Sequence, residues 1–239
     1  MRQTPLHPQT EAKPLSQSLS PPLSDGQSLD RGCDKVSDKG SQASPLHHPQ
    51  RIGLFGGSFD PVHLGHLLVA QAAREELELT NLFFIPAAQS PFKPEIQPTP
   101  APERLRLLRL ALAGKTWCEI DEQEISRGGV SYTIDTVDVY TRRLPKAQLI
   151  YLIGSDHLPQ LPKWRAAEEL ARLVEFVAIP RPGQGERPFP PPFRGRWLRG
   201  FPLGLSSSQI RDRVKAGRPI DHLVPDVVAE AIRNNRLYL

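Results

Sequence analysis

The amino-acid sequence predicts an α/β fold in which helices cover both faces of a doubly wound, mostly parallel sheet. Short apolar runs of strand length alternate with amphipathic helical segments from residue 51 to the C-terminus. This alternation is typical of parallel sheets, because a helical crossover returns the chain to the start of the next parallel strand. The 239 residues suffice for one such domain with a sizeable core. We therefore expect a Rossmann-like arrangement.

Residues 1–50 differ in composition from the rest of the chain. They contain no Phe, Tyr or Trp and are rich in Ser, Pro and Gln. Such a segment cannot bury enough apolar surface to offset the entropy lost on ordering. We expect a disordered, low-complexity N-terminal extension at 1–50 and one folded domain at 51–239. A transit peptide is the alternative, but acidic residues such as Glu11 and Asp25 argue against it.

The expected elements alternate along the folded part. Strands are expected at residues 51–55, 82–86, 117–120, 148–153 and 174–179, and helices at 64–79, 102–113, 134–144, 164–173, 207–216 and 225–235. The stretch 180–202, rich in Pro, Gly and Arg, is expected to be an extended surface loop. Ligands of doubly wound sheets bind beyond the carboxyl ends of the strands, so the chemistry should follow Phe55, Ile85 and Ile153.

Composition excludes several classes of partner. The net charge is only +4 and basic residues are interspersed with acidic ones, so we expect no nucleic-acid binding. No apolar run approaches the roughly 20 residues that span a bilayer. The two cysteines, Cys33 and Cys118, fit no metal or redox spacing, which favours a reducing compartment and a cytoplasmic protein. Whether the protein is a homo-oligomer is left open.

A glycine- and histidine-containing segment directly follows the first expected strand. It reads GGSFDPVHLGH, from Gly56 to His66. The glycine pair permits a tight turn and close approach of a phosphate, and the following helix start offers free N–H groups. His63 and His66 are three positions apart, so both imidazoles lie on one face of a helix start. Taken singly, a glycine turn and two surface histidines are the simpler interpretation, but the combination points to a phosphate site. No P-loop or G-x-G-x-x-G sequence is present in this segment.

A second anion-binding segment precedes the helix expected at 207–216. An anion could bind there to the hydroxyls of Ser207 and Ser208 and to the free backbone amides of the helix start. Arg211 adds a planar guanidinium suited to phosphate oxygens. Ordinary serine capping of the helix is the alternative explanation.

Together these two segments resemble the motifs of the nucleotidyltransferases that carry an H-x-G-H signature. The resemblance implies that Gly56, Gly57, Ser58 and Phe59 line the ATP site. It implies catalytic roles for His63, His66 and Arg211: the histidines bind the ATP phosphates and stabilise the transition state. Ser207, Ser208 and Arg211 would grip the β- and γ-phosphates.

Further blocks resemble the nicotinate-nucleotide adenylyltransferase branch of these enzymes. F-I-P followed by S-P-F-K suggests Lys93 as a phosphate contact, and S-Y-T-I-D-T suggests that Tyr132 and Thr133 line the pyridine-nucleotide pocket. Read without the resemblance, Lys93 is a solvated loop lysine, and Thr133 or Asp135 caps a helix. Gly154-Ser155-Asp156 ends the central strand.

The resemblance implies that Gly154 and Asp156 contact the ATP ribose and that Trp164 stacks on the nicotinate ring, although Trp164 could also be a core residue. The implied reaction transfers AMP from ATP to nicotinic acid mononucleotide and releases pyrophosphate. Mg²⁺ would be held mainly by ATP phosphates, with no dedicated protein metal site. Another phosphorylated acceptor, such as nicotinamide mononucleotide or 4′-phosphopantetheine, and a non-catalytic nucleotide-binding module are the alternatives.

Overall fold

The computed structural model describes residues 49–239 except 93, 94, 96 and 202. These residues belong to one compact unit, Leu46–Leu239. The prediction of disorder for residues 1–50 therefore concerns residues outside the described part of the chain, apart from Pro49 and Gln50. Gln50 already belongs to the fold, since its carbonyl accepts a hydrogen bond from the backbone N–H of Gln148 at 2.8 Å.

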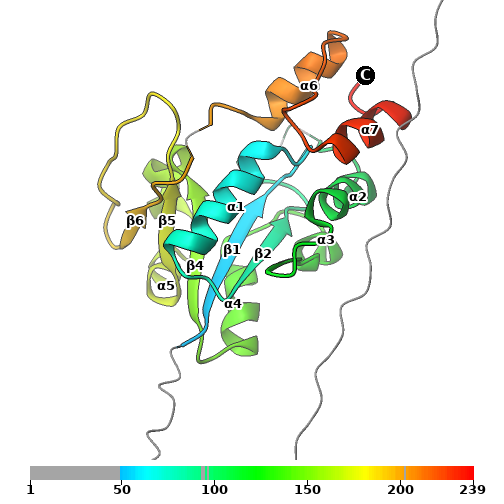
Figure 1. The fold of residues 1–239 in the computed structure, drawn as a ribbon. Coiled ribbons are helices and arrows are strands. Elements are labelled where there is room, and N and C mark those ends of the chain that lie inside the picture. Colours follow the sequence, from blue (N-terminus) through cyan, green and yellow to red (C-terminus); the bar gives the residue numbers. More distant parts are fainter. Residues whose placement is uncertain (1–48, 93–94, 96, 202) are drawn as a thin grey trace, which may run out of the picture. The chain divides into compact units, whose positions relative to one another are not determined.

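The described residues form a six-stranded parallel sheet in the order β3-β2-β1-β4-β5-β6. The strands are β1 (Arg51–Gly57), β2 (Asn81–Pro86), β3 (Cys118–Ile120), β4 (Gln148–Gly154), β5 (Glu175–Ile179) and β6 (Gly195–Trp197). The chain winds outward from β1 to β3, returns to β4 beside β1, and winds outward in the opposite direction (Figure 1). The predicted doubly wound, Rossmann-like sheet is confirmed, and its switch point lies between β1 and β4.

Helices cover both faces of this sheet. They are α1 (Leu64–Glu76), α2 (Ala101–Leu112), α3 (Gln123–Arg127), α4 (Thr133–Arg143), the 3₁₀ helix η1 (Ser155–Lys163), α5 (Ala167–Leu173), α6 (Ser207–Lys215) and α7 (Asp226–Asn234). Buried side chains of α1, α2, α6 and α7 share one apolar cluster with the sheet, and those of α4, η1 and α5 share the other. Figure 1 shows α1 lying across β1 on the first of these faces.

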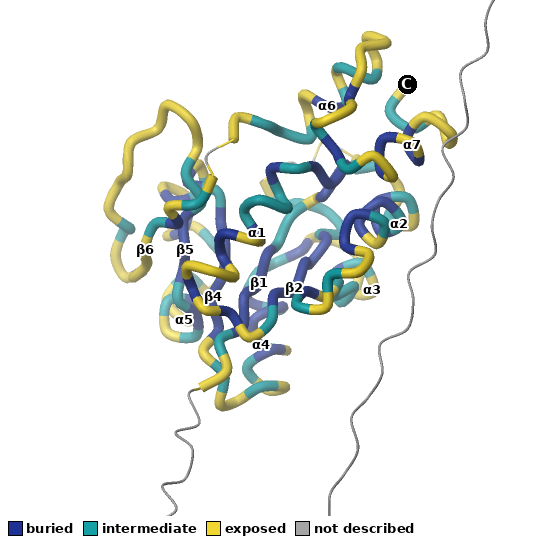
Figure 2. Tube along the Cα trace, in the orientation of Figure 1, coloured by how far each residue is buried: buried dark blue, intermediate teal, exposed yellow. Residues whose placement is uncertain are grey.

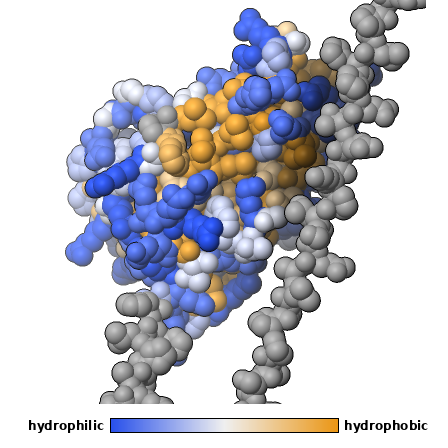
Figure 3. Space-filling model, in the orientation of Figure 1, coloured by the Kyte–Doolittle hydropathy of each residue, from blue (hydrophilic) through white to orange (hydrophobic). Residues whose placement is uncertain are grey.

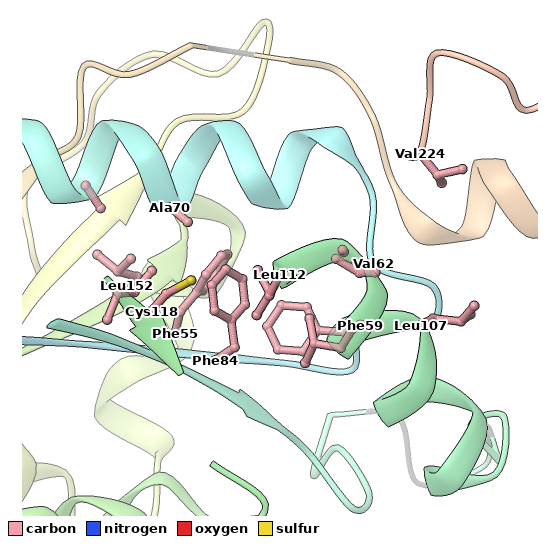
Figure 4. Close-up of a cluster of buried hydrophobic side chains, with 14 of the residues drawn as sticks. Phe55, Phe59, Val62, Ala70, Phe84, Leu107, Leu112, Cys118, Leu152 and Val224 are labelled. Carbon is pink, nitrogen blue, oxygen red and sulfur yellow. The ribbon is translucent and has the colours of Figure 1, made fainter. Parts of the chain in front are cut away.

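The side chains of the central strands alternate between the two clusters. In β1, Leu54 faces the α4 side whereas Phe55 faces the α1 side, where it packs against Phe84 with ring centroids 5.5 Å apart. Figure 4 shows this aromatic group beneath α1, together with Phe59 and Leu112. Because both faces are covered, the strands are apolar in nearly every position, as is usual for parallel sheets. Figure 2 shows the resulting buried strands inside a more exposed outer layer.

Several predicted boundaries are wrong, and three elements were not predicted. β1 continues through Gly56 and Gly57 instead of stopping before them, because both residues pair with β2. The helix expected at 164–173 begins only at Ala167, since Trp164 ends the 3₁₀ helix η1, which contains two prolines, and Ala166 has a left-handed backbone conformation. The short helix α3 and the edge strand β6 also lacked a periodic signal.

The stretch 180–202 is therefore not only a loop. Gly195–Trp197 pairs with β5, and the position of Gly195 requires glycine: an added Cβ would overlap the Phe176 carbonyl. Three residues among prolines and arginines carry too little alternation to predict a strand.

The surface of the domain is mixed in polarity. Figure 3 shows an apolar area over α1, where Leu64, Leu67 and Leu68 line a shallow groove with Trp117. No helix of the described residues is long and apolar enough to cross a membrane.

Candidate active site

The principal pocket lies at the carboxyl ends of β1 and β4, at the switch point of the sheet. It has a volume of about 340 Å³. Its lining includes nearly all of the residues expected at the ATP site: Gly56, Gly57, Ser58, Phe59, His63, His66, Gly154, Ser207, Ser208 and Arg211. The exception is Asp156. The pocket thus collects residues that are up to about 155 positions apart in the sequence, as the Rossmann-like order predicts.

The two histidines lie together at the start of α1. His63 is the N-cap residue and His66 is three positions inside the helix. Their rings stack with centroids 3.7 Å apart and an interplanar angle of 24°. Gly65 makes room for this stack, because an added Cβ would lie 3.0 Å from two atoms of the His63 ring. The prediction that the two imidazoles lie on one face of the helix start is confirmed.

The environment keeps these imidazoles neutral. Burial, followed by the positive charge of Arg181, lowers the pKa of His63 to about 4. Burial, the neighbouring His63 and Arg181 lower the pKa of His66 in the same direction. The His66 Nδ1 atom accepts a hydrogen bond from the backbone N–H of His63 at 3.2 Å. The neutral ring therefore carries its proton on Nε2, where it is available to donate to a phosphate oxygen.

The second predicted segment is joined to the first by direct hydrogen bonds. The guanidinium of Arg211 donates to the backbone carbonyl of Asp60 at 2.7 Å and to Ser208 Oγ at 3.2 Å. Ser207 Oγ donates to the Pro61 carbonyl at 2.8 Å. The imidazoles and the guanidinium consequently face one pocket.

The capping alternative for this segment applies to a different serine. Ser206 is the N-cap of α6, and its Oγ accepts from the Gln209 N–H at 3.3 Å. Ser207 and Ser208 lie within the first turn and line the pocket. Capping therefore does not account for the latter two hydroxyls, which hydrogen-bond to the Pro61 carbonyl and to Arg211 at the edge of the pocket.

An arginine that the sequence did not single out stands at the mouth of the pocket. Arg181 follows β5, lines the pocket and donates from Nε to Asp156 Oδ1 at 3.2 Å. A Cβ added to Gly154 would lie 3.2 Å from the Arg181 guanidinium, so the glycine admits this close approach. Asp156 is exposed and paired, and it does not line the pocket. Only the path of the chain after β5 brings Arg181 here; the sequence signal was limited to an arginine-rich loop.

Among the described residues expected at the nicotinate end, Tyr132, Thr133 and Trp164 lie outside the pocket lining. Lys93 is not among the described residues. Tyr132 directly precedes α4. The guanidinium of Arg165 lies over its ring, with 4.9 Å between the guanidinium carbon and the ring centroid. Thr133 Oγ1 donates to the hydroxyl of Tyr151 at 3.5 Å. The capping alternative is wrong, since the N-cap residue is Tyr132 and no side chain makes the cap hydrogen bond.

Trp164 occupies an intermediate position between core and surface. It is partly buried, and its ring lies 6.0 Å from Phe176 of the core and 5.6 Å from the exposed Phe92. Tyr151, a second residue that the sequence did not single out, connects this region with the phosphate end. Its ring lies 6.4 Å from Trp164, and its hydroxyl lies where a Gly56 side chain would be.

The described residues contain no group of three or more His, Cys, Asp or Glu side chains that could hold a metal ion. Asp60 is the buried carboxylate of the pocket lining, and its Oδ2 accepts from the Thr99 N–H at 3.1 Å. The pocket instead offers imidazole, guanidinium, hydroxyl and backbone N–H donors. A donor set of this kind binds a polyanion.

The chain is similar to several known proteins. Residues 54–213 match the family model described as cytidylyltransferase-like. A nicotinic acid mononucleotide adenylyltransferase of Plasmodium falciparum, solved in complex with APC, has a TM-score of 0.66 and 17% identity over 79% of this chain and 97% of that chain. This structural likeness concerns the fold. Fold and pocket together define an α/β protein of the cytidylyltransferase-like class.

Two relatives narrow the class. The nicotinate-nucleotide adenylyltransferase of Bacillus subtilis (strain 168) is 37% identical over 191 residues, or 79% of this chain and 98% of that protein. A protein of Opitutus terrae named "probable nicotinate-nucleotide adenylyltransferase" is 41% identical over 196 residues, or 79% of this chain and 97% of that protein. The chain belongs to the nicotinate-nucleotide adenylyltransferase family.

Proposed function

We propose that this protein transfers the AMP part of ATP to nicotinic acid mononucleotide, giving nicotinic acid adenine dinucleotide and pyrophosphate in NAD biosynthesis. The observation that carries the proposal is the joining of two phosphate-binding helix starts in one pocket, through the hydrogen bonds of Arg211 and Ser207 to Asp60 and Pro61. One triphosphate between α1 and α6 would meet donors from both helices.

The reaction is an in-line displacement at phosphorus. A 5′-phosphate oxygen of the acceptor attacks the α-phosphorus of ATP, the bond from this phosphorus to the bridging oxygen breaks, and pyrophosphate leaves with the electron pair. No general base is required, because the attacking phosphate is anionic at neutral pH. Positioning and neutralisation of charge supply the rate enhancement.

Each group of side chains has a part in this step. His63 and His66 donate from their rings to the α-phosphate as charge builds on it. Ser207, Ser208 and Arg211 hold the departing β- and γ-phosphates. Gly56, Gly57, Ser58 and Phe59 form the backbone wall, while Gly154 and Asp156 face the ribose once Arg181 releases the carboxylate.

At the acceptor end, Tyr132, Thr133 and Trp164 surround the pyridine ring, and Lys93 contacts the phosphate. Mg²⁺ would be held mainly by the phosphate oxygens of ATP and would neutralise part of their charge. We propose a cytoplasmic location as well, since the two cysteines favour a reducing compartment.

The test is a pyrophosphate-release assay with purified protein, ATP and Mg²⁺, offering nicotinic acid mononucleotide, nicotinamide mononucleotide and 4′-phosphopantetheine in parallel. We expect the highest kcat/KM with the nicotinate acceptor. Preference for either of the other acceptors would retain the chemistry but overturn the substrate. Binding of ATP without pyrophosphate release from any acceptor would make the protein a non-catalytic nucleotide-binding module.

A further inference from the structure

A fully buried arginine lies directly beneath the phosphate-binding turn. Arg104 of α2 has 1% of its surface exposed, which is unusual for a charged side chain. Its guanidinium donates to three backbone carbonyls: Thr99 at 2.8 Å, Ser58 at 2.8 Å and Ala87 at 2.9 Å. These carbonyls belong to three separate segments, so one side chain holds three loops together.

The three segments all adjoin the pocket. Ser58 follows β1 and Ala87 follows β2, and both residues line the pocket. The Ala87 N–H also donates to the Gly57 carbonyl at 2.9 Å, which ties the two strand ends to each other. Arg104 therefore acts on the carbonyl groups of a turn whose other side faces the ligand.

The electrostatic partner of Arg104 lies in the same turn. Burial lowers the pKa of the Arg104 guanidinium, and the charge of the buried Asp60 opposes this shift by favouring the charged form of Arg104. Asp60 Oδ2 accepts from the Thr99 N–H at 3.1 Å, while the Thr99 carbonyl accepts from Arg104. The backbone of Thr99 thus links Arg104 to Asp60 in the turn, through one hydrogen bond to each residue.

A tyrosine next to the C-terminus lies near Arg104 and Asp60. Burial and the nearby Asp60 carboxylate raise the pKa of Tyr238, the penultimate residue. Tyr238 is partly buried and packs against the apolar cluster that contains Phe59. Arg104, Asp60 and Tyr238 are called the buried brace below.

We propose that Arg104 is a positioning residue, which acts through the buried brace to hold the turn Ser58–Asp60 in its ligand-binding geometry. From the pocket side, Arg211 donates to the Asp60 carbonyl. From the core side, Arg104 donates to the Ser58 carbonyl. The turn is held between the two guanidinium groups, and its carbonyls are turned toward them.

A purely stabilising role does not require a charge at this position. An apolar side chain would pack in a buried helix position without the cost of burying a guanidinium. The fork of Arg104 reaches carbonyls from different loops, which the single ammonium group of lysine cannot do with the same geometry. Its replacement should therefore disturb the placement of ATP relative to the acceptor, to which in-line transfer is sensitive.

The experiment compares Arg104→Lys with the parent protein, by kcat and by the KM values for ATP and nicotinic acid mononucleotide, after circular dichroism and thermal unfolding have verified the fold. This inference rests on the proposed adenylyl transfer; an inactive parent would refute that function, whereas an active parent tests the brace. We expect kcat to fall by ~10-fold or more. The KM for nicotinic acid mononucleotide should change by less than about 3-fold, since the three hydrogen bonds of Arg104 go to Thr99, Ser58 and Ala87 and not to Tyr132, Thr133 or Trp164.

A second variant keeps the test decisive if Arg104→Lys does not fold. Asp60→Asn removes the charge that faces Arg104, while an amide oxygen can still accept from the Thr99 N–H, and we expect a smaller loss of kcat with the same KM pattern. Tyr238→Phe removes the hydroxyl near Asp60 and leaves the ring in place, and it should change kcat less than Asp60→Asn. Tyr140→Phe is the matched control: Tyr140 is buried on α4, donates to Asp121 at 2.5 Å, and does not line the pocket. Kinetic constants of the folded brace variants that equal those of Tyr140→Phe would overturn the proposal.

Discussion

Replacing His63 by glutamine should remove much of the sensitivity of the folded protein to acid. Glutamine retains polar atoms but does not titrate in this range. His63 is 5% exposed, and burial together with Arg181 lowers its pKa from 6.5 to about 4. The folded protein therefore disfavours the protonated ring, whereas the unfolded chain accepts a proton at ordinary mildly acidic pH.

The sign and size of the effect follow from this difference. Stability from the neutral His63 is fully present above pH 6.5 and is lost as the pH falls toward 4. Between pH 8 and pH 5, these two pKa values correspond to a loss of about 2 kcal/mol in the free energy of unfolding. The stacked His66, whose pKa is lowered in the same direction, adds to the acid sensitivity of the parent but remains in both proteins.

The assay is urea unfolding of the parent and His63→Gln at pH 8 and pH 5 in the absence of nucleotide. We expect the stability of the parent relative to the variant to decrease by about 2 kcal/mol at the lower pH. His222→Gln, at an exposed position before α7, controls for removal of a histidine as such. Parallel pH profiles of the parent and His63→Gln would refute the assignment of a buried neutral imidazole.

Four further outcomes are expected. Gly56→Ala should reduce the free energy of unfolding by ~1–3 kcal/mol, because the new Cβ overlaps the Tyr151 hydroxyl. Urea unfolding should show a smaller loss in the Tyr151→Phe background; an equal loss would contradict this contact. Arg211→Lys should lower kcat/KM for ATP by ~10-fold or more, since lysine lacks the fork that reaches Asp60 and Ser208; unchanged steady-state constants would exclude this role. His66→Ala should lower kcat by ~100-fold or more in the pyrophosphate assay with the fold intact by circular dichroism, and near-normal turnover would contradict its assigned donor role. Trp164→Ala should raise the KM for nicotinic acid mononucleotide more than that for ATP, and the reverse pattern would make Trp164 a core residue only.

Local sequence features predicted most of the sheet and its helices. The run Ile52–Phe55 is mostly apolar and is followed by Gly56, and the structure places a central strand there. The elements without such features were missed. β6 is held in place by the β5 backbone, and η1 has prolines that hide its helical character. For β6, pairing with the neighbouring strand, and not local preference, selects the conformation.

The residues of the candidate site also fall into two groups: those that local spacing predicted and those that it did not. Short-range spacing sufficed for the histidine pair, since residues three apart on a helix start share one face. It did not suffice for Arg181, Tyr151 and Arg104, whose roles depend on partners far along the chain. Arg104, for example, appeared as one more charged residue in an amphipathic helix, and only the folded chain brings three carbonyls to it.

By itself, the sequence determined the α/β class, the doubly wound order of elements and the two segments able to bind phosphate, because each depends on periodicity or spacing over a few residues. The tertiary structure decided that these segments share one pocket, that His63 is buried and His66 partly buried with both imidazoles neutral, and which arginines surround them. The physical reason is the distance along the chain over which each property is set. Helix starts and turns are local, whereas burial and charge proximity arise only when distant segments pack against each other.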